Sequence, residues 1–98
     1  MWILQSSSAD VDPLTFRLRP GAIKTVGRAP RADFIVDAAL VSRLHCRLTA
    51  SHDHLDVVDL SSTNGTFVND KRVKNARLSA GDRLRIGRVE LTIGTTKS

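Results

Sequence analysis

Short runs of alternating or wholly apolar residues follow one another along the chain, with polar turns between them. No segment has the 3.6-residue apolar period of a long amphipathic helix. We expect strands at residues 1–5, 15–19, 24–27, 34–36, 45–49, 55–60, 66–68, 72–73, 83–86 and 89–93. Turn signals such as Pro20-Gly21, Asn64-Gly65 and Ala80-Gly81-Asp82 separate several of them. Many short strands at this spacing predict an all-β fold, namely an antiparallel β-sandwich.

The length of 98 residues fits one domain, which can bury a core without disulfides or metal. We assign residues 1–94 to that domain. Residues 95–98 offer nothing to bury, so we expect a flexible C-terminal end and the truncation point of a longer protein. The lone Cys46 cannot form an internal bridge, which suits a reducing compartment, and its alternating surroundings predict a packed strand position. No window approaches a membrane span and the start lacks a signal peptide, so we expect no membrane partner.

The charge balance favours an anionic partner. Lys and Arg number 15 against 10 Asp and Glu, giving a formal net charge of +5. Seven basic residues and the single acid Asp82 lie between Lys71 and Arg88. Such an excess suits a phosphopeptide, a nucleic acid or an acidic protein segment.

Three separated segments carry the chemistry of an anion site. Gly27-Arg28 supplies a charge, Ser42-Arg43-Leu44-His45 a hydroxyl and a second charge, and Thr63-Asn64-Gly65 a hydroxyl on a tight turn. Each has an ordinary explanation when taken alone: Arg28 as a solvated charge or one paired with Asp33 or Asp37, and Asn64-Gly65 as a plain hairpin. The ordered set is what points to a function.

Catalysis and metal binding find little support in the sequence. Ser42 and His45 suggest a nucleophile pair, but no Gly-x-Ser-x-Gly elbow or oxyanion-hole sequence accompanies them. A buried His45 that braces neighbouring loops is the better interpretation. His52 and His54 flank Asp53 in a turn without further metal ligands, so we interpret them as solvated. We therefore expect no enzyme activity, no metal and no cofactor.

The ordered set of motifs, with Asn69 after them and a Gly81-Asp82-Arg83-Leu84 turn near the end, resembles the forkhead-associated (FHA) domain. That family reads phosphothreonine in peptides. The resemblance implies an FHA-type (SMAD/FHA-like) sandwich of about eleven short strands with the ligand loops at one end. It further implies the following roles: phosphate contacts from Arg28, Ser42, Arg43 and Thr63, a peptide-backbone contact from Asn64, and loop shaping by Gly27, His45, Gly65 and Asn69.

The first residues and the approach to Gly27-Arg28 are similar to the FHA domain of a DNA double-strand-break repair complex. That likeness implies a nuclear protein that binds phosphothreonine peptides, acidic in character, of repair or checkpoint factors. The alternative is a bacterial or other signalling FHA domain in the cytosol. Residues 38–41 lack a basic side chain for reading an acidic flanking residue, so Lys71, Arg72 and Lys74 are the candidates for that task.

Two further functions stay open. Nucleic-acid binding through the basic stretch is expected to be at most weak, because Trp2, Phe16, Phe34 and Phe67 are assigned to the core and leave no stacking platform. A scaffold that dimerises through its sheet faces is the other alternative. We expect a monomer in isolation.

Overall fold

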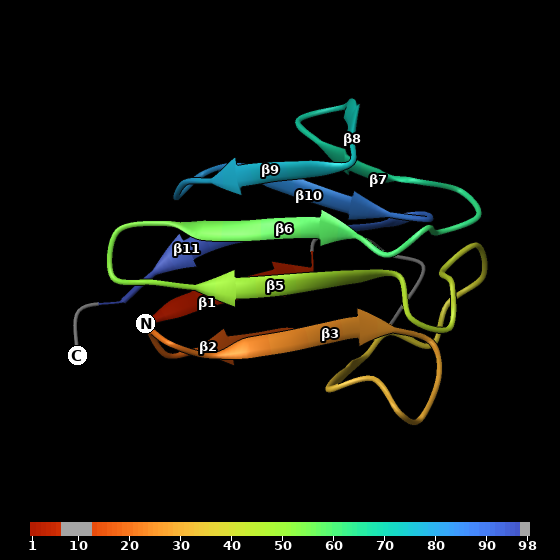
Figure 1. The fold of residues 1–98 in the computed structure, drawn as a ribbon, viewed down its shortest axis with the longest axis horizontal. Helices are drawn as coiled ribbons and strands as arrows, with labels where there is room; N and C mark the ends of the chain where they lie inside the picture. Colours follow the sequence, from red (N-terminus) through yellow and green to blue (C-terminus); the bar gives the residue numbers. More distant parts are fainter. Residues whose placement is uncertain (7–12, 97–98) are drawn as a thin grey trace.

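Two facing β-sheets make up the computed structural model, which describes residues 1–6 and 13–96 and contains eleven strands in that part (Figure 1). The six-stranded sheet has the order β2 (Thr15–Leu18), β1 (Trp2–Ser6), β11 (Val89–Thr95), β10 (Arg83–Ile86), β7 (Thr66–Val68) and β8 (Lys71–Val73). The five-stranded sheet has the order β4 (Phe34–Ile35), β3 (Ile23–Gly27), β5 (Cys46–Ala50), β6 (Leu55–Asp59) and β9 (Asn75–Leu78). The predicted all-β sandwich of about eleven strands is confirmed.

Strand pairing is antiparallel in both sheets with one exception. β4 pairs with β3 in parallel, through Val26 with Phe34 and Gly27 with Ile35. The connection between them is too short for an ordinary parallel crossover. It is instead closed by Asp33, whose carboxylate accepts hydrogen bonds from the Thr25 backbone N–H at 2.9 Å and the Thr25 hydroxyl at 3.1 Å. Asp33 thus fixes the connection that carries Arg28. One interpretation of the sequence paired Asp33 with that arginine, and the structure shows no such pair.

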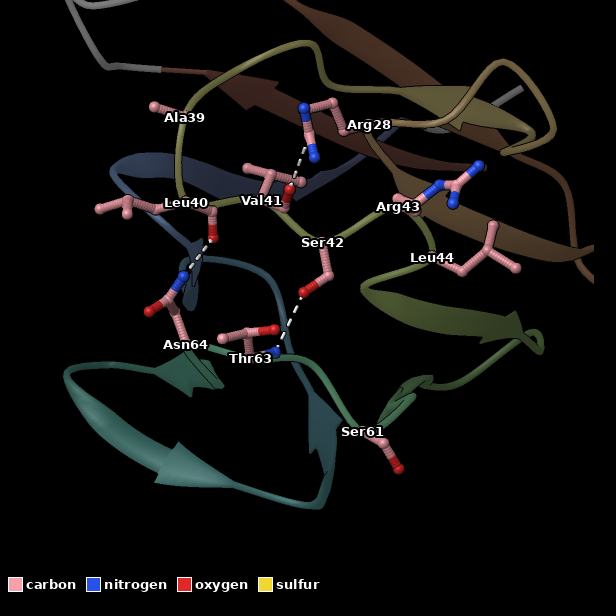
Figure 2. A pocket seen from close by; sticks show the side chains of 10 residues that line it. All are labelled: Arg28, Ala39, Leu40, Val41, Ser42, Arg43, Leu44, Ser61, Thr63 and Asn64. Carbon is pink, nitrogen blue, oxygen red and sulfur yellow. Dashed lines mark hydrogen bonds between the residues drawn. The ribbon is translucent and has the colours of Figure 1, made fainter.

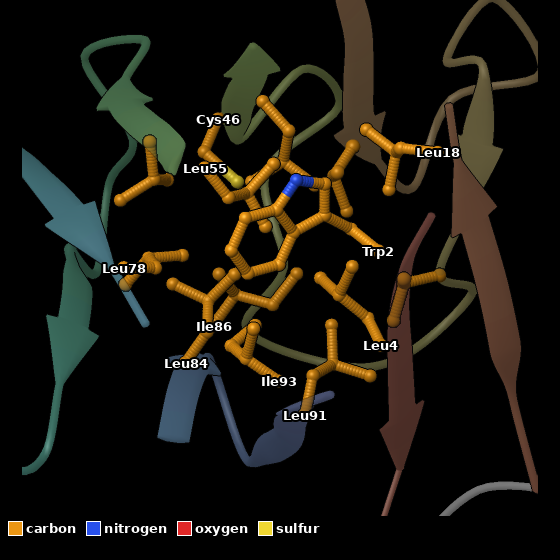
Figure 3. Packing of buried hydrophobic residues seen from close by; sticks show 14 of the residues in the cluster. Trp2, Leu4, Leu18, Cys46, Leu55, Leu78, Leu84, Ile86, Leu91 and Ile93 are labelled. Atoms are coloured by element: carbon orange, nitrogen blue, oxygen red, sulfur yellow. The ribbon is translucent and has the colours of Figure 1, made fainter. Parts of the chain in front are cut away.

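The core lies between the sheets because alternate side chains of each strand point inward. Leucine, isoleucine and valine side chains fill it (Figure 3). Trp2 is buried among them, and its indole N–H donates to the Ser51 carbonyl at 2.8 Å. Cys46 is fully buried, as predicted, and burial, followed by the nearby Asp59 charge, raises the pKa of its thiol to about 12.

Some sequence expectations for the strands were wrong. β9 was missed, because its four residues hold only two inward positions, Ala76 and Leu78. β11 continues beyond residue 93 to Thr95, and the Thr96 N–H donates to the Met1 carbonyl. The domain boundary at residue 94 stays a prediction, and residues 97–98 of the expected flexible end lie outside the described residues.

Phe67 does not belong to the core. It faces outward from β7, and the guanidinium of Arg85 on β10 lies 4.2 Å from its ring centroid. Phe16 and Phe34 do pack against the core and stack on each other with centroids 4.5 Å apart. The assignment of Phe67 followed from its apolar character alone, whereas the period of two in β7 turns Thr66 inward.

Three connections meet at one end of the sandwich, at the right of Figure 1. They are the β3–β4, β4–β5 and β6–β7 connections, which hold the three candidate motifs. Met1 and the C-terminal end of β11 lie at the opposite end in that view. Among the described residues there is no helix of sufficient length and apolarity to cross a bilayer.

Candidate functional site

A pocket of about 680 Å³ opens where these connections meet (Figure 2). Its lining includes all five side chains that the sequence analysis assigned to ligand contacts: Arg28, Ser42, Arg43, Thr63 and Asn64. Ala39, Leu40, Val41, Leu44 and Ser61 complete the wall. Residues up to 36 positions apart in sequence therefore share one cavity, since Arg28 and Asn64 both line it.

Gly27 allows the β3–β4 and β4–β5 connections to come into contact. The N–H of Arg28 donates to the Ser42 carbonyl and that of Ala29 to the Arg43 carbonyl, each at 3.0 Å. A Cβ atom added to Gly27 would lie 2.1 Å from the Arg43 carbonyl oxygen, a backbone atom. Gly27 is therefore needed for this close approach, and not for the turn geometry expected from the sequence, since its φ is not positive.

The two arginines of the site are held differently. The Nε of Arg28 donates to the Val41 carbonyl at 3.2 Å, which fixes the side chain and leaves both terminal nitrogens for a ligand. Arg43 also lines the pocket, but Figure 2 shows its guanidinium directed away from the hydroxyls of Ser42 and Thr63. Arg28 is thus the cation already positioned in the pocket, and Arg43 has to change rotamer to reach its centre.

The Ser42 hydroxyl is oriented for donation into the pocket. Its oxygen accepts the Thr63 backbone N–H at 3.0 Å, so its own proton is free for a ligand acceptor. Asn64, on the same loop as Thr63, donates its side-chain amide to the Leu40 carbonyl at 3.1 Å. That bond uses one of two amide protons, and the other proton and the amide oxygen stay available. The β4–β5 and β6–β7 connections are therefore tied together across the pocket.

His45 is the brace beneath the site, as the sequence suggested. Its ring is fully buried, with Nδ1 at 3.0 Å from the Ser42 nitrogen and Nε2 at 2.8 Å from the Gly65 oxygen. Because a backbone N–H only donates and a carbonyl only accepts, Nδ1 is unprotonated and Nε2 carries the proton. The ring bonds the backbone of Ser42 and not its hydroxyl, so it does not act as the base of a Ser–His nucleophile pair.

A second polar network fixes the β6–β7 connection, and sequence reasoning missed it. Asp59 accepts hydrogen bonds from the Ser62 hydroxyl, from the Ser62 N–H at 3.1 Å and from the Thr66 hydroxyl at 2.7 Å. Burial acts to raise the pKa of Asp59, but the bonds from Ser62 and Thr66 outweigh it and lower the pKa below 3.8. Ser62 in turn accepts the Gly65 N–H at 3.0 Å, so this serine is structural and does not serve the ligand. The spacing Asp59-x-x-Ser62 is the local signal that was available.

Gly65 and Asn69 shape the chain in different places. Gly65 has φ +90°, and a Cβ there would lie 2.7 Å from the Nε of Arg72. Asn69, with φ 49°, sits in the β7–β8 turn and accepts the Arg83 N–H at 2.9 Å through its side-chain oxygen. Asn69 thus anchors this turn to β10 and is not part of the pocket lining.

Two residues of the wall have left-handed backbones that sequence reasoning did not anticipate. Leu40 has φ 70° and Ser61 has φ 58°. Such angles cost non-glycine residues about 1–2 kcal/mol and concentrate at binding sites. Leu40 is also 47% exposed, so an apolar side chain stands open at the edge of the pocket.

The described residues contain no group of three or more His, Cys, Asp or Glu side chains arranged to hold a metal ion. His54 instead lies 3.6 Å from Asp56, at the surface. The chemistry that the pocket can perform is recognition of an anion by one fixed guanidinium, hydroxyl donors and an amide.

Known proteins similar to this chain are members of one family of phosphopeptide-binding domains. The family model described as "FHA domain" matches residues 24–87. The glycogen accumulation regulator GarA of Mycobacterium tuberculosis is 39% identical over 74 residues, which cover 76% of this chain and 46% of GarA. An oxoglutarate dehydrogenase inhibitor of Corynebacterium jeikeium is 40% identical over 65 residues, covering 66% of this chain and 45% of that protein. The chain spans about half the length of these relatives.

Solved structures agree over nearly the whole chain. The FHA domain of FhaA was crystallised in complex with the intracellular domain of another protein. It matches this chain with a TM-score of 0.85 at 32% identity, and the match covers 95% of this chain and 99% of the FhaA domain. A structure from a study of phosphothreonine-dependent FHA domain interactions has a TM-score of 0.84 at 30% identity, with coverage of 99% and 98%. The bacterial relatives do not support the expected likeness to the repair-complex subunit nibrin, nor a nuclear repair role. That expectation relied on the first residues and on the approach to Gly27-Arg28, two short segments that do not distinguish one member of the FHA family from another.

Proposed function

The chain belongs to the FHA domain family, a family of phosphopeptide-binding signalling modules, and from this premise we propose that it binds phosphothreonine peptides in bacterial signalling. The observation that carries the proposal is the single pocket shared by Arg28, Ser42 and Thr63, with His45 bonded to two of its connections. The protein acts by recruitment and not by catalysis. Its relatives named as a regulator and an inhibitor are consistent with that role.

The physical basis is the match between pocket and ligand. A phosphothreonine carries about −1.5 to −2 charges and three strong acceptor oxygens. Arg28 offers its terminal nitrogens and Ser42 its hydroxyl proton, and the Thr63 hydroxyl lies beside them. Because hydrogen bonds already fix these donors, little ordering entropy is lost when the phosphate binds. We assign the peptide-backbone contact to the remaining donor and acceptor of Asn64.

We infer that the partners are bacterial regulatory or metabolic proteins phosphorylated on threonine, and that the protein works in the cytosol. The similarity to a glycogen accumulation regulator and to an oxoglutarate dehydrogenase inhibitor, two proteins named for the control of metabolism, supports this inference. Capture from the phosphorylated proteome of the source cell would identify the partner within that class.

Calorimetric titration with matched peptides tests the proposal. We expect the phosphothreonine peptide to bind and its unphosphorylated form not to bind. Arg28→Ala should weaken binding by tenfold or more, because hydrogen bonds to charged groups contribute about 1.5–3 kcal/mol. Arg31→Ala is the matched control, since Arg31 is exposed on the same connection and does not line this pocket. Equal affinity for the two peptides would refute the proposal.

A further inference from the structure

A second groove runs beside the pocket, on the side of the β6–β7 connection that faces β8. Its volume is about 830 Å³, and it is lined by Ser61, Ser62 and Asp59 together with Arg72, Lys74 and three neighbours. Ser61 lines both the groove and the pocket. Figure 2 shows the Ser61 side chain directed away from Ser42, so this residue stands between the two cavities. A peptide held in the pocket can therefore continue into the groove.

The positive charges of this groove are not neutralised by neighbouring carboxylates. In the basic stretch from Lys71 to Arg88, Arg77 pairs with Asp56 at 3.2 Å and Arg83 with Asp70 at 3.6 Å. Neither Arg72 nor Lys74 has an ion-pair partner within residues 1–6 and 13–96. The basic excess of the chain thus becomes a local field at the groove, next to a pocket that takes an anion.

Asp59 is the one carboxylate among the described residues that line the groove, and its oxygens are already hydrogen-bonded. Asp59 accepts bonds from the Ser62 hydroxyl and N–H and from the Thr66 hydroxyl. These donors partly offset its charge, and the two cations Arg72 and Lys74 outnumber it in the lining of the groove. Arg72 and Lys74 are the donors that face a ligand in the groove, and they determine the sign of the charge it accepts.

The fold places both residues beside the groove. The Arg72 side chain lies against Gly65, where a Cβ would be 2.7 Å from its Nε. The Lys74 carbonyl accepts the Asp59 N–H at 2.8 Å, which ties the residue to the end of β6. Gly65, which the sequence indicated as a turn residue, therefore also makes room for Arg72. The anion pocket and the basic groove share one scaffold.

We propose that this groove binds a second anionic side chain of the same peptide, a carboxylate or a second phosphate within about four residues of the phosphothreonine. Arg72 and Lys74 are the specificity-determining residues of this subsite. The proposal rests on the proposed function, because the phosphothreonine fixes the peptide that the groove reads. Selection comes from charge in a groove open to solvent, so it responds to salt.

Fluorescence-anisotropy titrations with three peptide sets test the proposal on the whole chain. The first set has phosphothreonine with alanine flanks, the second adds one Asp at each flanking position in turn, and the third adds one phosphoserine in the same way. We expect one or two positions at which Asp strengthens binding about two- to fivefold and phosphoserine about tenfold. Rising salt should shrink these gains.

The variants assign the gain to the groove. In Arg72→Gln/Lys74→Gln the gain from the second anion should disappear, while the alanine-flanked peptide binds within about twofold of the unaltered protein. Arg17→Gln/Arg19→Gln removes the same number of charges and is the matched control, because Arg17 lies on β2, at the opposite edge of the six-stranded sheet from β8, and Arg19 directly follows that strand. Because Arg72 packs against Gly65, Lys74→Gln alone serves as an independent variant, with a partial loss expected.

The outcomes separate this inference from the proposed function. If the alanine-flanked phosphopeptide binds but no position gains from an anion, or the gain survives in the double variant, the second subsite is wrong and phosphothreonine reading stands. If Arg17→Gln/Arg19→Gln removes the gain equally, the effect is one of net charge and the groove is not a site. If no phosphothreonine peptide binds at all, both proposals fail.

Discussion

Replacing His45 with alanine removes the brace that joins the β4–β5 and β6–β7 connections. The ring is 0% exposed and makes two hydrogen bonds, accepting the Ser42 N–H at 3.0 Å and donating to the Gly65 carbonyl at 2.8 Å. The substitution leaves both backbone groups without their partner and opens a cavity under the pocket. Stability and ligand binding should therefore fall together.

The magnitude follows from the burial of the two orphaned groups. A buried polar group that loses its partner costs about 1–3 kcal/mol. The Gly65 carbonyl is in a buried bond, whereas the Ser42 N–H is in a part-buried one and can recruit water. We therefore expect the free energy of unfolding to fall by about 2–4 kcal/mol, which lowers the Tm of a domain of this size by about 10–30 °C.

Thermal and urea denaturation measure the loss of stability, and a phosphothreonine peptide titration measures the loss of order in the pocket. Binding should weaken about tenfold or more at a temperature where the variant is folded, since one lost ordering interaction of about 1.4 kcal/mol has that effect. His54→Ala is the matched control. Its ring is 32% exposed and its contact with Asp56 is 3.6 Å, so we expect less than about 0.5 kcal/mol.

One result would refute the reasoning about the brace. If His45→Ala loses less than about 1 kcal/mol and binds peptide normally, the two bonds do not hold the connections. A loss of stability equal in His45→Ala and His54→Ala would likewise contradict the assignment, because only one of these rings is buried.

Three further outcomes are expected. Gly27→Ala should destabilise the domain and disrupt the pocket more than Gly94→Ala, because a Cβ at Gly27 would lie 2.1 Å from the Arg43 carbonyl oxygen, whereas one at Gly94 would meet only the Ile3 carbonyl oxygen at 3.8 Å and neither glycine has a positive φ; equal Tm losses in melting curves would contradict this. Asp59 has a lowered pKa in the folded state, so its carboxylate stabilises the fold at pH values above its ordinary pKa of 3.8, and that contribution is lost as the pH falls below 3.8 toward the folded-state pKa. Asp59→Asn should therefore flatten the decrease of Tm at acid pH. An unchanged decrease would show that this carboxylate is not responsible for it. The Cys46 thiol, with its pKa raised to about 12, should react with thiol reagents only at the rate of unfolding; fast labelling of the native protein would show that the site is open.

Much of the fold could be read from the pattern of residues. All ten expected strands overlap observed ones with shifts of at most two residues at either end, and Thr66–Val68 and Arg83–Ile86 match fully. These strands alternate inward and outward side chains, which is a local property. The parallel pairing of β4 with β3 was not predictable in this way, because it depends on how Asp33 closes the intervening connection on Thr25.

The candidate site was likewise predictable in its residue types but not in the contacts that these residues make. The residue types of Arg28, Ser42, Thr63 and Asn64 suggested an anion site, and their order suggested the family. The sequence did not reveal that Ser62 is used internally by Asp59 and Gly65, because adjacent hydroxyls on a loop look alike until the backbone turns one of them inward. The reason for Gly27 was likewise hidden, since the atom that it must admit belongs to Arg43.

The sequence by itself determined which side chains are available: a basic chain, a set of alternating strands and three polar segments with the chemistry of anion recognition. Tertiary structure alone decided which of these side chains share a pocket, and it separated Arg28, fixed by Val41, from Arg43, turned away. In the folded structure Arg72 and Lys74 line a groove beside that pocket, whereas Arg77 and Arg83 pair with carboxylates outside it. The physical reason is that residue type and period are local along the chain, whereas charge pairing and the meeting of loops depend on contacts that form only when the two sheets pack.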